Sequence, residues 1–119
     1  MKRLLLGIAL LAIGISGIAI AGEGEGSWTG EIVDLACYIP QGAKGSDHAG
    51  CAKSCVKNGQ PMGLLTDDGT LVLLAADHKG GEPYEALKDL AGEQAHVTGS
   101  LAERGGMKVV TVTGSKAAS

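Results

Sequence analysis

The chain has 119 residues, which is enough for one domain of ordinary size. Its formal net charge of −3 and its aromatic content of 3% exclude the basic, aromatic-rich surface that is typical of nucleic-acid-binding proteins. The core must be built from Val, Leu, Ile and Ala, and a cross-link or a metal ion would help to stabilise such a small core.

Residues 1–21 are predicted to be a secretory signal peptide. Lys2 and Arg3 precede an apolar run, and Ala19 and Ala21 fit the small-residue pattern that a signal peptidase cleaves. An uncleaved anchor is the alternative, because the run is long enough to span a membrane. We therefore expect a periplasmic or secreted protein that is free of the membrane after cleavage.

The first half of the remaining chain is predicted to hold one strand and one helix. Residues 22–27 are rich in glycine and read as a flexible linker. Residues 28–35 alternate in a way that predicts a strand, and residues 36–46 are predicted to be a loop. A helix is expected at 47–57, with Asp47 as its N-cap.

The second half is predicted to hold four short strands and one helix. Apolar segments at 62–66 and 70–75 flank a turn that is typical of a hairpin. The other predicted elements are a helix at 83–90, strands at 94–101 and 107–113, and a tail at 115–119.

This order of elements predicts a mainly β fold for the domain at 28–114. We expect an OB-like, five-stranded antiparallel barrel. The cysteine-bearing helix would lie between strands 1 and 2, and the other helix between strands 3 and 4. An open five-stranded α+β sandwich is the alternative.

Three cysteines and one histidine form the most informative cluster of the sequence. On the predicted helix, His48, Cys51 and Cys55 fall on one face at about 100° per residue. Cys37 follows the first strand, from which a loop can bring it over that face. Three thiols and an imidazole suit copper or zinc as four metal ligands. Zinc would indicate a structural site, and copper would indicate trafficking, sensing or electron transfer.

Other polar residues are assigned smaller roles. Asp34 could orient the His48 ring as a hydrogen-bond partner behind the ligands, or could cap a turn. Met62 could add a soft ligand, although strand packing explains it as well. His78 and His96 are expected to be peripheral.

Two other readings of the cysteines remain open. In an oxidising compartment, Cys37 could pair with Cys51 or Cys55, which would give a disulfide-stapled accessory module for another envelope protein. Alternatively, Cys51 and Cys55 could serve a thiol redox protein or sensor. No catalytic set beyond the thiols is visible, so a binding role is expected rather than an enzyme.

The cluster also resembles a segment of a group of small exported bacterial proteins. The resemblance is carried by Asp34-x-x-Cys37 and by His48-x-x-Cys51-Ala52-x-x-Cys55. It implies export and an OB-like fold, and it implies no established activity.

Overall fold

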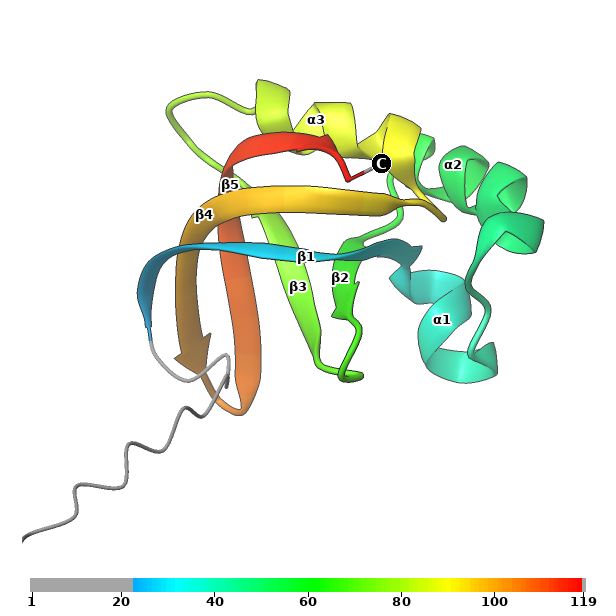
Figure 1. Cartoon of the computed structure of the whole chain (residues 1–119), viewed down its shortest axis with the longest axis horizontal. Coiled ribbons are helices and arrows are strands. Elements are labelled where there is room, and N and C mark those ends of the chain that lie inside the picture. Colours follow the sequence, from blue (N-terminus) through cyan, green and yellow to red (C-terminus); the bar gives the residue numbers. More distant parts are fainter. Residues whose placement is uncertain (1–22, 119) are drawn as a thin grey trace, which may run out of the picture.

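The structure is a computed structural model, and it describes residues 23–118 (Figure 1). The predicted signal peptide, residues 1–21, lies outside the described residues. Within residues 23–118, no helix has both the length and the apolar character needed to cross a membrane.

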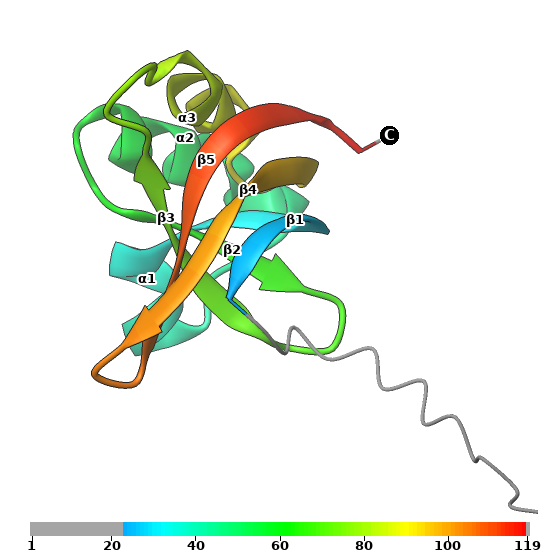
Figure 2. The ribbon, with the colours of Figure 1, turned by 90° about the vertical axis from the view of Figure 1, so that its left-hand side faces the viewer.

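Five strands form one closed barrel, in the order β1-β2-β3-β5-β4 (Figures 1 and 2). This confirms the prediction of a mainly β, five-stranded barrel, and it excludes the open sandwich. The strands are β1 (Gly24–Asp34), β2 (Met62–Thr66), β3 (Leu71–Ala76), β4 (Gln94–Arg104) and β5 (Met107–Ala117).

The prediction that every strand pair is antiparallel is wrong at one seam. Strands β3 and β5 run parallel, with Leu73 opposite Val109, whereas the other four pairs are antiparallel. The reason is geometric, because alternating strand directions cannot close around an odd number of strands. A closed barrel of five strands therefore needs at least one parallel pair, and the chain reaches it through a long crossover connection.

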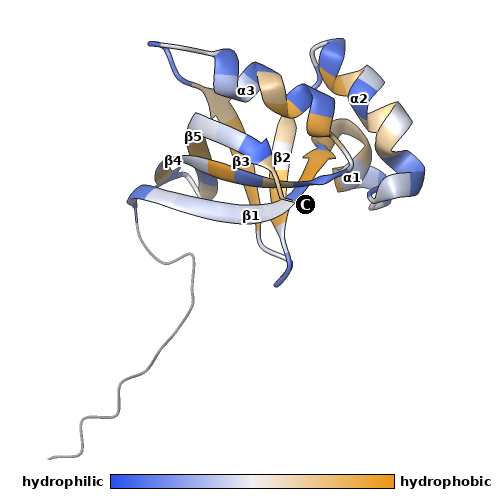
Figure 3. Ribbon diagram, turned by 45° about the horizontal axis from the view of Figure 1, so that its top comes forward, coloured by the Kyte–Doolittle hydropathy of each residue, from blue (hydrophilic) through white to orange (hydrophobic). Residues whose placement is uncertain are grey.

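The helices lie in two of the connections between strands. Between β1 and β2 are α1 (Leu35–Gln41), a 3₁₀ turn η1 (Ser46–His48) and α2 (Ala49–Lys57). Between β3 and β4 are α3 (Glu82–Leu87) and the 3₁₀ turn η2 (Lys88–Leu90). Figure 3 shows that hydrophobic residues gather on the strands, whereas the helices alternate hydrophobic and hydrophilic residues.

Residues 36–46, predicted to be a loop, contain the short helix α1. The Asp34 side chain starts it by accepting a hydrogen bond of 2.9 Å from the Ala36 N–H. Gly42 ends it in the left-handed conformation, with φ +67°, and its N–H donates to the Tyr38 carbonyl. Pro40 removes only one donor from so short a helix.

Two strands are longer than the sequence pattern predicts. Residues 24–27, expected to be linker, belong to β1, where Gly24 lies opposite Leu101 of β4. Residues 115–117, expected to be tail, belong to β5, where Ala117 lies opposite Ala95. Both extensions pair with the long strand β4, which leaves few of its backbone groups without a partner.

The core fills the barrel interior and extends under the helices. Helix α2 contributes Ala52 and Val56, both nearly inaccessible to solvent. Trp28, Tyr84 and Leu90 pack against the core from its edge. The buried core residues are Ile32, Ala52, Val56, Met62, Leu64, Val72, Leu74, Leu87, Ala91, Ala95, Val97, Leu101, Val110 and Val112.

A first prediction concerns Gly30, where β1 pairs with both β2 and β4. A Cβ at this position would lie 2.3 Å from the carbonyl oxygen of Leu65, so backbone would have to move. We expect Gly30→Ala to lower the free energy of unfolding by about 2–3 kcal/mol, as measured by chemical denaturation.

The matched control is Gly50→Ala, on helix α2. No atom lies within 4 Å of its Cβ position, so this variant should raise stability by about 0.5–1 kcal/mol through helix propensity. Equal stabilities of the two variants would contradict the close approach of β1 and β2.

Candidate metal centre

A buried carboxylate marks the junction of β1 and α1. Asp34 is the last residue of β1, pairs with Met62 of β2 and is only 1% exposed. Its Oδ1 atom accepts the capping hydrogen bond from Ala36, whereas no atom of the described residues is a hydrogen-bond partner of Oδ2. Burying a polar atom without a partner costs free energy, so Oδ2 calls for an explanation.

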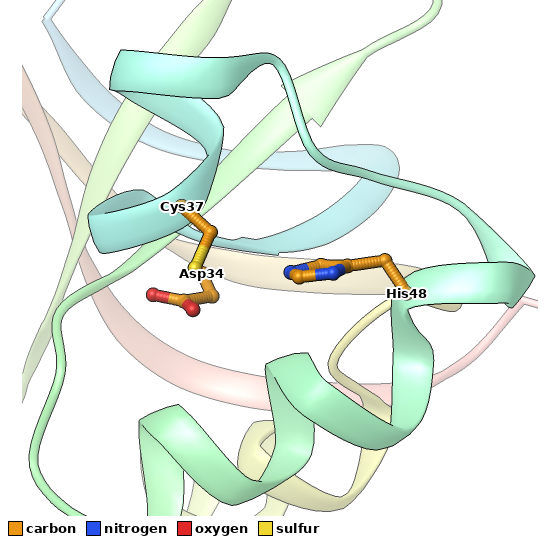
Figure 4. Close-up of side chains that lie close together, drawn as sticks. All are labelled: Asp34, Cys37 and His48. Atoms are coloured by element: carbon orange, nitrogen blue, oxygen red, sulfur yellow. The ribbon is translucent and has the colours of Figure 1, made fainter.

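A thiol and an imidazole meet this carboxylate from two other elements. Cys37 lies on the first turn of α1, and His48 ends η1, directly before α2. One ligand atom from each of Asp34, Cys37 and His48 lies within 4.8 Å of the other two. Figure 4 shows the His48 ring pointing toward the other two side chains. We call these three residues the candidate centre.

The imidazole of the candidate centre also has an unsatisfied atom. His48 Nε2 is buried, and no atom of residues 23–118 serves it as a hydrogen-bond partner. Two buried polar atoms without partners therefore belong to the same group of three side chains. A carboxylate oxygen, a thiolate and an imidazole nitrogen are all ligands of zinc, and three of them leave a fourth position free.

Three contacts hold the η1–α2 segment against the barrel. Gly92 allows a close approach, since a Cβ there would lie 2.5 Å from the Ala49 Cα. Lys53 forms a 2.9 Å ion pair with Glu93 at the start of β4, and the Glu31 carboxylate accepts a 2.8 Å hydrogen bond from the Gly45 N–H. These contacts fix His48 relative to β1.

The carboxylate of Asp34 influences two thiols. Hydrogen-bonding interaction with this carboxylate is the main cause that raises the pKa of Cys37, followed by burial and by the Asp34 charge. The same causes, together with the nearby Cys51, raise the pKa of Cys55 to about 12. The raised pKa values mean that both thiols keep their protons beside the carboxylate. A thiol is only a weak hydrogen-bond donor, and neither thiol forms a hydrogen bond of normal geometry with Oδ2. A bound cation would displace such a proton.

The other predicted ligands, Cys51, Cys55 and Met62, and the two peripheral histidines lie outside the candidate centre. Cys51 is exposed and Cys55 is half-buried on α2. Met62 is completely buried and belongs to the core. His78 and His96 are exposed, and the His96 ring hydrogen-bonds the Thr29 hydroxyl.

All three cysteines lie within the described residues and are free thiols. The structure therefore does not contain the disulfide from Cys37 to Cys51 or Cys55 that was the alternative to a metal site. The raised pKa of Cys55, one of the two thiols in the redox alternative, opposes the thiolate form at that position.

Sequence reasoning placed Asp34 behind the ligands, whereas the structure places its carboxylate among the ligand atoms. The signal was present in the Asp34-x-x-Cys37 spacing. An N-cap residue and the residue three positions later meet at the first helical turn. It was missed because the helix α1 was not predicted.

Comparisons with family models, with curated proteins and with solved structures give no match for this chain. The resemblance to small exported bacterial proteins therefore remains a prediction.

A second prediction concerns the order in which the thiols react. Cys51 is exposed to solvent. Cys55 has a pKa of about 12, so at pH 8 only a fraction of about 10⁻⁴ of the Cys55 side chains is in the reactive thiolate form. We expect alkylation at Cys51 well before Cys55, followed by peptide mass spectrometry. Rapid alkylation of Cys55 in folded protein, at the rate found in denatured protein, would contradict the Asp34 contact.

Proposed function

We propose that this protein is an exported metal-binding module that holds one zinc ion through Asp34, Cys37 and His48. The observation that carries the proposal is the pair of buried atoms without partners, Asp34 Oδ2 and His48 Nε2, beside the Cys37 thiol. One cation would satisfy both atoms together. Their burial without a cation costs free energy, which explains why the three side chains converge.

The types of ligand atom favour zinc over copper. Cu(I) prefers soft sulfur ligands, whereas the candidate centre offers one sulfur, one nitrogen and one oxygen atom. Zinc accepts all three and completes a tetrahedron with a fourth ligand. Copper held by Cys37, Cys51, Cys55 and His48 is the alternative, and it requires both α2 thiols to join the centre.

Export and the type of barrel belong to the same proposal. Lys2, Arg3 and the Ala19-x-Ala21 site support export to the periplasm or beyond. The strand order β1-β2-β3-β5-β4, with α3 between β3 and β4, supports an OB-type barrel. In that setting the module would hold or hand over zinc, with another envelope protein as partner.

A third prediction tests the ligand set by zinc competition titrations on anaerobically purified protein. We expect one zinc ion per chain, and at least about 100-fold weaker binding in Cys37→Ser and His48→Gln, because each removes a direct ligand. Asp34→Asn should weaken binding as well while keeping the helix cap, since Asn is also a good N-cap.

His96→Gln is the matched control for the imidazole, because His96 is exposed and lies outside the candidate centre. Zinc binding that survives Cys37→Ser, or wild-type protein that binds copper and no zinc, would overturn this proposal.

A fourth prediction concerns pH. The pKa of Cys37 is raised, so its thiol is protonated between pH 6 and 8 and must lose a proton when zinc binds. Apparent zinc affinity should therefore fall at least about tenfold for each unit by which the pH is lowered. Titrations at pH 6, 7 and 8, corrected for the competing chelator, measure this slope. A flat profile would exclude Cys37 as a thiolate ligand.

A further inference from the structure

We propose that the thiols of Cys51 and Cys55 form an exchange port, through which zinc passes between a thiol-bearing partner and the candidate centre. This inference rests on the proposed function, because it needs an ion in that centre. It adds a route for the ion and a chemical class of partner.

The outer half of the port lies on helix α2. Cys51 and Cys55 are one turn apart on this helix, where side chains four residues apart are neighbours on the surface. Cys51 is exposed and Cys55 is half-buried, so the two thiols lead from solvent toward the barrel. His48, a member of the candidate centre, lies directly before this helix at its N-cap position.

The inner half of the port joins the candidate centre. Helix α2 packs against β1, which ends at Asp34. The Asp34 carboxylate and the Cys51 thiol both raise the pKa of Cys55, which agrees with this packing of α2 on β1. Asp34 is 1% exposed and its Oδ2 atom has no partner within the described chain. The proposed route therefore runs from an exposed thiol, through a half-buried thiol, to a buried carboxylate.

Ligand exchange along this route needs no electron transfer. The thiol of Cys51 binds the zinc ion as the bond between zinc and a partner sulfur breaks, and the proton of Cys51 passes to that sulfur. A second exchange of the same kind moves the ion to Cys55, and a third delivers it to the candidate centre. Because the three ligands of the candidate centre leave one position of a zinc tetrahedron free, Cys55 can stay bound while the ion enters the centre, and the Cys37 proton then passes to the Cys55 sulfur.

The port favours a partner that is recognised by sulfur rather than by charge. Both lysines of α2 are already paired: Lys53 with Glu93 at 2.9 Å, and Lys57 with Asp89 at 2.7 Å. The positive charges of this helix are therefore balanced by carboxylates of neighbouring segments. A donor or acceptor that holds zinc through thiolates matches Cys51 in ligand type.

The test measures the rate of zinc transfer separately from zinc affinity. The zinc complex of dithiothreitol is mixed with metal-free protein in a stopped-flow instrument, and equilibrium titrations give Kd for the same samples. We expect Cys51→Ser to slow transfer at least about tenfold. The variant lacks the first protein thiol that can take zinc from dithiothreitol and pass it on within the same chain. Kd should change by less than about threefold, because Cys51 lies outside the candidate centre.

The matched control is the double variant Cys51→Ser with Ser54→Cys. Ser54 is exposed on the same helix, about 100° around the axis from Cys55. A thiol there should not restore the transfer rate, and full restoration would overturn the port.

Two other results would also overturn the port, and they leave the proposed function standing. One is an unchanged transfer rate in Cys51→Ser. The other is a large loss of affinity in the same variant, which would make Cys51 a permanent ligand. Wild-type protein that binds no zinc in the equilibrium titration would instead refute the proposed function itself.

Discussion

The structure depends on one carboxylate at the point where the first strand becomes a helix. One oxygen of Asp34 accepts the Ala36 N–H, which ends β1 and starts α1. That helix carries Cys37 to its place beside Asp34 and His48, and the other oxygen of Asp34 has no hydrogen-bond partner among the described residues. Oδ1 of Asp34 thus holds the start of α1, and Oδ2 remains available as a metal ligand. The geometry of the site and the local folding of the chain therefore depend on the same residue.

The energetic cost of this arrangement falls on the metal-free protein. A buried carboxylate with one unsatisfied oxygen, and an imidazole with one unsatisfied nitrogen, both destabilise the folded chain. The Asp34 carboxylate favours the neutral thiol form of Cys37 and Cys55, and it therefore raises the pKa of each. Neutral thiols add no further negative charge beside the carboxylate. A bound cation would remove this cost, because it would favour the thiolate form of Cys37 and would give both Asp34 Oδ2 and His48 Nε2 a partner. Binding of a cation should therefore raise the free energy of unfolding of the protein.

The sequence was informative where the pattern was local. Alternating residues and turn signals predicted five strands, and the helix expected around Cys51 and Cys55 is present as α2, whereas His48 belongs to the 3₁₀ turn before it. It was less informative where structure depends on distant partners. Residues 24–27 look like a glycine-rich linker until β4 pairs with them. The role of Asp34 depends on α1, a helix that contains Pro40 and so lacks the usual pattern. The parallel pairing of β3 with β5 follows from the closure of a barrel with an odd number of strands. This closure depends on all five strands and cannot be read from any one segment of the sequence.

The parallel seam also has a consequence for the order of folding. Strand β5 forms a local hairpin with β4, but its other edge pairs with β3, more than thirty residues earlier in the chain. Such distant pairing is slow, because the entropy of closing the intervening loop must be lost first. During synthesis, β1, both cysteine-bearing helices and β3 all precede the strand that closes the barrel. All three thiols therefore leave the ribosome before the barrel on which their helices pack can close.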